Sequence, residues 1–260
     1  MPRIAVGIEY LGTNYVGWQL QAGRRSVQGA VEAALSAVAN GPVRTICAGR
    51  TDAGVHALGQ VVHFDTPAER AARAWVLGAN TRLPPDIALT WAREMPPDFH
   101  ARFGAVSRTY HYHILNRSER PALAAGRVTW VRRPLEVARM NLAAAHLLGE
   151  HDFNAFRAME CQSRTPVRRV TALAVCREGD RVTITVTANA FLHHMVRNIA
   201  GLLISVGRGD TGPDFAAEVL ASRDRTRNAA TAPADGLYFV AASYPREFAV
   251  PAGVSAMIPL

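Results

Sequence analysis

Arg50, Asp52 and His56 lie within seven residues of one another and form the densest group of reactive side chains in the chain. They belong to a polar stretch between two apolar runs that predict strands, where catalytic groups are often displayed. A guanidinium next to Asp52 would keep its carboxyl ionised, because a cation favours the charged form of an acid. Such an anionic oxygen can act as a nucleophile or stabilise a developing cation, without a metal. The alternative is an ordinary turn, in which an Asp two residues before Gly54 bonds local backbone N–H groups.

Aromatic and imidazole side chains alternate at Tyr110, His111, Tyr112 and His113. Successive side chains of a strand point to opposite faces, so a strand here puts the two tyrosines on one face and the two histidines on the other. One interpretation is a half-buried aromatic strand. The other is a platform on which a nucleic-acid base stacks, as in RNA-binding sheets.

Other routes to chemistry have less support. His193 and His194 are adjacent, and on the helix predicted over 193–206 they point about 100° apart and cannot chelate one ion together. The three cysteines form no CxxC pair, and the chain has no lysine for a Schiff base and no Gly-rich nucleotide fingerprint. We therefore expect no metal and no cofactor.

All 29 cationic Lys and Arg positions are Arg, and their distribution is uneven. Residues 101–181 hold fourteen Arg and seven acidic residues, a net of +7, whereas residues 1–100 have a net of +1 and residues 182–260 a net of zero. Guanidinium groups bind phosphate bidentately and stack on bases, so the block indicates a nucleic-acid partner. A genome that encodes every cation as Arg would explain the missing lysine but not the block.

The elements that must position these groups follow from hydrophobic periodicity. The first part of the chain predicts strands over 3–9, 43–48, 59–64 and 87–93, with helices over 26–38 and 68–78. The second part predicts strands over 108–115, 169–176, 181–188 and 237–243, with helices over 135–148 and 193–206.

This order predicts an α+β fold with two similar halves, each a mainly antiparallel sheet with helices on one face, and a central active-site cleft. We expect a domain over 1–104 that carries the Asp52 loop. A second domain over 105–260 would carry Tyr110 and much of the basic RNA face. The chain has no apolar run near the ~20 residues of a membrane span, and its first ten residues are too short for a signal-peptide core. We therefore expect a cytoplasmic protein without a membrane partner.

One Asp, one Arg and one aromatic side chain are few functional groups for a reaction on RNA. Nucleases usually use metals or paired acid and base groups, and methylation needs a cofactor. Rearrangement of a nucleoside needs neither, because its atoms only change partners. Two alternatives stay open: an RNA-binding module without catalysis, and a glycosidase-like hydrolase that uses the Asp on a sugar and releases free uracil.

The chain resembles the tRNA pseudouridine synthase A family over almost its whole length. The stretch AGRTDAGVHALGQVVHF around Asp52 is similar to the family's catalytic segment. Seven supporting stretches follow the family's order: YVGWQLQ (15–21), RSVQ (25–28), DFHARF (98–103), SRTYHYHI (107–114), CQSRTP (161–166), FLHHMVRNIAG (191–201) and DGLYF (235–239). The chain departs from the family at Leu11, where an acid is more usual, and in its lack of lysine.

The resemblance implies isomerisation of uridine to pseudouridine at positions 38, 39 and 40 of the tRNA anticodon stem-loop, by base flipping and without a cofactor. Asp52 would be the nucleophile on the ribose or the uracil ring, and Arg197 would pair with it and hold it ionised. Tyr110 would stack on the flipped uracil and help to remove the C5 proton. Arg50 would occupy or brace the space that the base leaves, and Leu237 would pack beneath the uracil.

The same resemblance implies a homodimer that grips one tRNA across both subunits. Phosphate contacts would position the RNA without reading its sequence. We assign these contacts to four arginines, Arg25, Arg164, Arg168 and Arg169.

Overall fold

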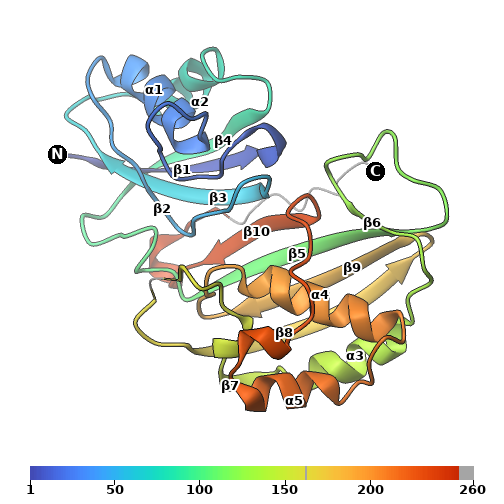
Figure 1. The fold of residues 1–260 in the computed structure, drawn as a ribbon. Coiled ribbons are helices and arrows are strands. Elements are labelled where there is room, and N and C mark those ends of the chain that lie inside the picture. Colours follow the sequence, from blue (N-terminus) through green and yellow to red (C-terminus); the bar gives the residue numbers. More distant parts are fainter. Residues whose placement is uncertain (162, 252–260) are drawn as a thin grey trace. The chain divides into compact units, whose positions relative to one another are not determined.

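The computed structural model describes residues 1–161 and 163–251. Gln162, which is part of the CQSRTP stretch, lies outside the described residues. Helices and strands both contribute throughout, so the predicted α+β class is confirmed (Figure 1).

The chain forms two compact units. The first comprises Met1–Arg108 and the segment that begins at Tyr238, and the second comprises Thr109–Leu237. The domains expected from the sequence divide the chain close to the same point, but they assign the C-terminal strand to the second domain.

The first unit contains a mainly antiparallel sheet. Its elements are β1 (Arg3–Tyr10), the short helix η1 (Gly12–Asn14), α1 (Val27–Ala39), β2 (Ile46–Cys47), β3 (His56–Asp65), α2 (Ala72–Asn80), β4 (Ile87–Met95), β10 (Leu237–Ser243) and the short helix η4 (Arg246–Phe248). The strand order is β4-β1-β3-β10, and β2 pairs with β3. Only the pairing of β10 with β3 is parallel among the pairings described for this unit. Helices α1 and α2 cover one face of this sheet (Figure 1).

Local signals set the ends of α1. The Ser26 side chain accepts a hydrogen bond from the Gly29 N–H (3.3 Å) at the start, and Asn40 takes a left-handed conformation (φ 54°) at the end. Both are preferred capping arrangements. The predicted helix over 26–38 is confirmed.

The second unit repeats the plan of a sheet with helices on one side (Figure 1). Its elements are β5 (Ser107–Asn116), β6 (Thr129–Val131), α3 (Val137–Ala145), β7 (Gly149–Asp152), the short helix η2 (Asn154–Phe156), β8 (Val167–Glu178), β9 (Arg181–Ala188), α4 (Met195–Gly207), α5 (Phe215–Ser222) and the short helix η3 (Arg225–Arg227). The strand order is β5-β9-β8-β7, and β6 pairs with β5.

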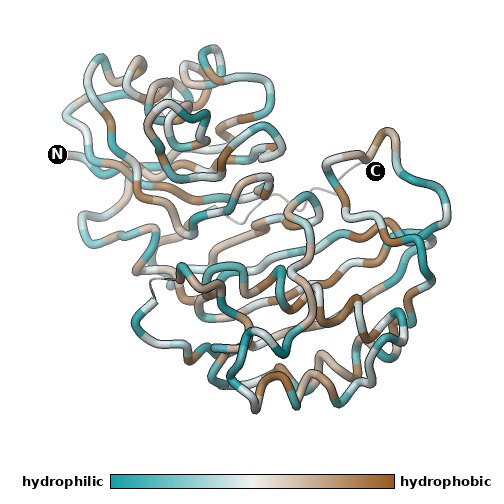
Figure 2. Tube along the Cα trace, in the orientation of Figure 1, coloured by the Kyte–Doolittle hydropathy of each residue, from teal (hydrophilic) through white to brown (hydrophobic). Residues whose placement is uncertain are grey.

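Alternation along β9 buries one face of this sheet. Val182, Ile184 and Val186 are buried, while the residues between them are half-exposed. Figure 2 shows the apolar residues of β9 and of α4 in brown. The turn between β8 and β9 lies at Gly179, whose φ of 57° suits glycine. Within residues 1–161 and 163–251, no helix is both long and apolar enough to cross a membrane.

Among the strands and α-helices, three were not expected from the sequence, namely β6, β7 and α5, and the four short helices η1 to η4 were not expected either. The strand expected over 43–48 shortens to the two residues of β2, whereas β3 extends beyond the expected 59–64 at both ends. β6 and β7 have three and four residues, too few for a periodic pattern to show.

Candidate active site

Asp52 lies on the loop between β2 and β3, which we call the Asp52 loop (residues 48–55). Its backbone is fixed from both sides. The Thr51 hydroxyl lies 2.7 Å from the buried Tyr10 hydroxyl, and the Thr51 carbonyl accepts a hydrogen bond from the Trp18 N–H (3.0 Å). These contacts join the loop to β1 and to the segment after η1.

Two glycines, Gly12 in η1 and Gly17 after it, allow this part of the chain to pass close to the Asp52 loop. A Cβ on Gly17 would lie 2.5 Å from the Thr51 carbonyl oxygen, and Gly17 has a φ of 101°. A Cβ on Gly12 would lie 1.9 Å from the Val55 carbonyl oxygen. No other residue type fits either position without movement of the Asp52 loop. Gly17 belongs to the YVGWQLQ stretch, but its clamping role was not foreseen from the sequence.

The ends of the loop are tied to β3. Buried His56 accepts a hydrogen bond from the Gly12 N–H at Nδ1 (3.0 Å), and its ring packs on Tyr238 of β10 (centroids 4.5 Å apart). The Gln60 side chain donates to the Gly49 carbonyl (2.6 Å). His56 is thus a core residue that shapes the loop.

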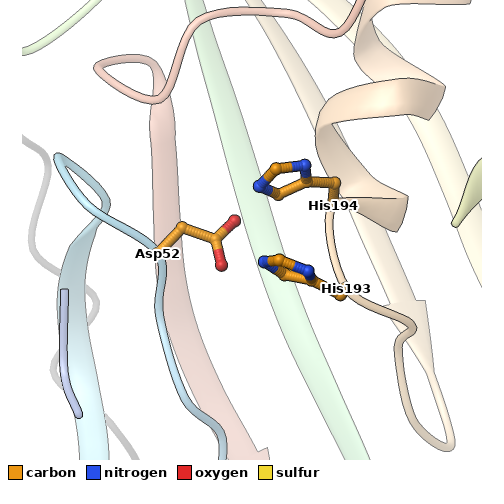
Figure 3. Close-up of side chains that lie close together, drawn as sticks. All are labelled: Asp52, His193 and His194. Atoms are coloured by element: carbon orange, nitrogen blue, oxygen red, sulfur yellow. The ribbon is translucent and has the colours of Figure 1, made fainter. Parts of the chain in front are cut away.

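Asp52 is half-buried, and Arg50 on the same loop is exposed. Figure 3 shows the Asp52 carboxylate extending from the loop. The Asp52 carbonyl accepts a hydrogen bond from the Val55 N–H (3.2 Å), so the loop does contain a tight turn. The turn fixes the backbone of Asp52, from which the carboxylate extends.

Tyr110, Leu237 and Arg197 all belong to the second unit. Tyr110 on β5 is buried, and its ring meets Phe191 edge-on (centroids 5.0 Å apart, 79° between planes). Leu237 is buried at the start of β10. The pairing of Arg197 with Asp52 stays a prediction.

Arg197 lies in the first turn of α4 and anchors a neighbouring loop. Its Nε donates to the Ala232 carbonyl (2.8 Å), and the Ala232 N–H donates to the Arg197 carbonyl (3.1 Å). Next to it, buried Asn198 donates to the Phe156 carbonyl (2.7 Å) and accepts from Thr231 (2.7 Å). The role of Asn198 was missed, although one amide inside an apolar helical run is the signal that could have revealed it.

The expected geometry of His193 and His194 is wrong. Both residues precede α4, and His194 takes a left-handed conformation (φ 62°) at its N-cap. Their rings therefore lie side by side, with centroids 4.1 Å apart and planes 39° apart, instead of diverging as on a helix (Figure 3).

Arg25, a predicted phosphate contact, is half-exposed and ion-paired with Asp86 (3.2 Å). Its guanidinium also lies over the Tyr15 ring, 4.5 Å from the centroid. Burial and the hydrogen bond to Asp86 raise the pKa of Tyr15 to about 12. Arg25 therefore has an intramolecular role at the start of α1 besides its exposed surface.

The other predicted phosphate contacts differ in exposure. Arg164 is exposed, and Arg169 is exposed and ion-paired with Glu150 (3.1 Å). Arg168 is buried instead, with 8% of its surface exposed. Its guanidinium donates to the Thr165 carbonyl (3.0 Å) and the Ser163 hydroxyl (2.6 Å). A contact between Arg168 and RNA would require these bonds to be exchanged.

The sequence was compared with known proteins. A family model described as tRNA pseudouridine synthase matches residues 7–104 and 143–245. The chain is 57% identical to a tRNA pseudouridine synthase A of Methylococcus capsulatus, over 95% of this chain and 91% of that one. The chain belongs to the tRNA pseudouridine synthase family. It is an isomerase that converts uridine to pseudouridine in tRNA.

Two further relatives bear the same name as the first. The protein of Nitrosococcus oceani is 55% identical over 96% of both chains. That of Vibrio cholerae is 55% identical over 96% of this chain and 94% of its own. Within this synthase, Arg50 and Asp52 lie in the first matched segment, Arg197 and Leu237 lie in the second, and Tyr110 lies between the two.

Proposed function

We propose that this synthase acts on the anticodon stem-loop of tRNA, at positions 38, 39 and 40, with Asp52 as its nucleophile and no cofactor. The observation that carries the proposal is the immobilised Asp52 loop within the matched family segment. A carboxylate held on a fixed backbone is pre-organised for attack, which is a large part of the advantage of an enzyme site.

The reaction is a rearrangement in which the bond from C1′ to N1 is replaced by a bond from C1′ to C5. A uridine flips out of the stack, which costs a few kcal/mol, least where pairing is weak. In the ribose route, the Asp52 oxygen bonds to C1′ while the bond from C1′ to N1 breaks, and uracil leaves as an anion. The uracil then rotates, C5 bonds to C1′, and Asp52 is released. Loss of the C5 proton and protonation of N1 complete an isomer of unchanged mass. In the alternative route, Asp52 attacks the uracil ring first.

Four further residues have roles in the proposed reaction. Tyr110 stacks on the flipped uracil, which returns ~1–3 kcal/mol of the flipping cost, and it helps to take the C5 proton. Its edge-on packing against Phe191 supports this role, because the ring is held in one orientation. Leu237 packs beneath the uracil, Arg197 keeps Asp52 ionised, and Arg50 braces the space left in the RNA.

Phosphate binding is assigned to the exposed arginines. Arg164 and Arg169 present charge at the start of β8, and Arg25 does so at the start of α1. Arg168 contributes chiefly by holding the loop between Ser163 and Thr165. We also infer a homodimer in the cytoplasm, on the family resemblance.

An unmodified tRNA transcript tests the proposal. We expect incubation with the protein in the presence of EDTA to give pseudouridine at positions 38, 39 and 40, at unchanged RNA mass. Release of free uracil would indicate a hydrolase instead. Binding without any product would indicate an RNA-binding module. Sedimentation of the protein alone tests the dimer.

A further inference from the structure

Phe103, in the DFHARF stretch after β4, has a large exposed aromatic ring. Its exposure is 78%, the highest of the phenylalanines that the structure describes. By contrast, Phe99 in the same stretch is fully buried. A single exposed apolar side chain is common on protein surfaces, and it is the fixed position of this ring and the charge beside it that favour a ligand.

The ring is held in place by a tight turn. His100 Nδ1 accepts hydrogen bonds from the Arg102 N–H (3.1 Å) and the Phe103 N–H (3.0 Å). The His100 ring lies 4.5 Å from the Phe103 ring and 4.7 Å from that of His63 on β3, centroid to centroid. Gly104 closes the turn by donating to the His100 carbonyl (2.8 Å). Little freedom is therefore lost when something stacks on Phe103.

A positive charge lies beside this ring. The Arg102 guanidinium lies 5.6 Å from the centroid of Phe103. Although burial raises the pKa of the Cys47 thiol to about 12, the charges of Arg50 and Arg102 both act to lower it. Arg102 and the arginine of the Asp52 loop thus lie around the same buried thiol.

A third arginine joins the turn to the Asp52 loop. Arg108 donates to the carbonyls of Arg102 and Ala105 on the turn. It also donates to the Ala48 carbonyl (3.2 Å), at the start of the Asp52 loop. The exposed ring and the proposed nucleophile therefore stand on segments that one side chain ties together.

We propose that Phe103 is a stacking platform for a nucleobase of the tRNA other than the reacting uridine, with Arg102 directed to the adjoining phosphate. The proposal rests on the proposed function, because it places the platform beside the loop that acts on tRNA. Stacking suits a substrate read at several positions, since every base has a π-face and no sequence is demanded. The flanking cations favour a polyanion over an apolar protein surface.

Substitutions at Phe103 test the contact. Phe103→Ala and Phe103→Leu are expected to raise the Kd for unmodified tRNA by about 5- to 100-fold at fixed salt, the loss typical of one base stack. Phe103→Trp should bind within about twofold of the wild type, because indole stacks at least as well. Leu77→Ala, an exposed apolar residue on α2 (52% exposed), is the matched control and should bind normally.

Three results would overturn the platform. The first is unchanged tRNA affinity in Phe103→Ala, and the second is wild-type affinity in Phe103→Leu, which would leave an apolar contact without stacking. The third is a changed sedimenting mass in Phe103→Ala, which would assign the ring to a second copy of the chain. Pseudouridine formation by the wild type is measured in the same preparation. If it occurs while the variants bind normally, only the platform fails; if it does not occur, the proposed function fails.

Discussion

Gly17 shows how much of the active-site geometry depends on a residue without a side chain. The segment after η1 passes so near the Asp52 loop that a single added carbon at Gly17 would overlap the Thr51 carbonyl. The position of the Asp52 loop is thus set by the lack of a side chain at Gly17 as well as by the hydrogen bonds that Thr51 makes.

Gly17→Ala is expected to lower the free energy of unfolding by about 3 kcal/mol, because a left-handed φ and a backbone clash both oppose the added carbon. Single-turnover pseudouridine formation should slow as the Asp52 loop shifts. Gly23→Ala is the matched control, since Gly23 has a φ of 68° but nothing within 4 Å of its Cβ position. It should cost only about 1 kcal/mol. Equal costs in urea titrations of the two variants would contradict the clamp.

On the proposed pairing of Arg197 with Asp52, Arg197→Met is expected to move the acidic limb of the pH–rate profile to higher pH, because the Asp52 carboxylate would lose its cation. Arg197→Lys should keep the limb near its original place, since it restores the charge. Both variants disturb the bond to the Ala232 carbonyl, so loop damage alone would affect them alike. An unmoved limb in Arg197→Met would mean that the proposed ion pair is absent.

At the scale of elements, the loop before β8 is organised by a buried cation. Arg168 donates hydrogen bonds to Ser163 and Thr165 of this loop. Its neighbour Arg169 is exposed and ion-paired with Glu150. Of these two adjacent arginines, one thus stabilises the loop from inside and the other is exposed at the surface.

Substitution of the two arginines should separate these tasks. Arg168→Met is expected to lower the free energy of unfolding by about 1–3 kcal/mol, because the buried guanidinium and its hydrogen bonds to Ser163 and Thr165 are lost. Arg169→Met should change it by less than about 0.5 kcal/mol, since exposed ion pairs contribute little. Urea unfolding of both variants measures the difference. Similar stabilities would remove Arg168 from its structural role.

The strand β3 carries a pH-dependent contact at His63. Burial, and then the nearby His100, lower the pKa of His63 to about 4, and its Nδ1 accepts from the Ala101 N–H (3.1 Å). The folded protein favours the neutral form of His63. The contribution of this contact to the free energy of unfolding is therefore complete above pH 6.5 and is lost as the pH falls toward 4. Between pH 7 and pH 5 the wild type should lose about 1–2 kcal/mol more than His63→Asn, which keeps an acceptor but does not titrate. Parallel losses in urea titrations at the two pH values would contradict this shift.

Local signals predicted elements well, and non-local contacts were harder to foresee. The ends of α1 follow from Ser26 and Asn40, whose side chain and backbone act within a few residues. His194 shows the opposite case, because its left-handed conformation at the N-cap makes the helix begin two residues later than periodicity indicates. The burial of Arg168 was not predictable either, since a basic residue in a charged stretch is usually at the surface.

At the scale of the whole molecule, charge and chemistry are distributed unequally. Asp52, the proposed nucleophile, belongs to the first unit, while most of the net +7 block over 101–181 belongs to the second. The family was recognised from the sequence because the AGRTDAGVHALGQVVHF stretch around Asp52 is long and specific. The glycine clamp that holds this stretch was not recognised, because contacts between distant segments leave no local pattern.

This division predicts that the acid is needed for turnover but not for RNA binding. Asp52→Asn keeps the size of the side chain and removes its charge, so the most direct measurement is pseudouridine formation and tRNA affinity on the same preparation of this variant. We expect turnover to fall by at least about 10³-fold, as on loss of other nucleophiles, with a Kd within about threefold of the wild type. Pseudouridine formation at the wild-type rate by Asp52→Asn would contradict the proposed role of this carboxylate.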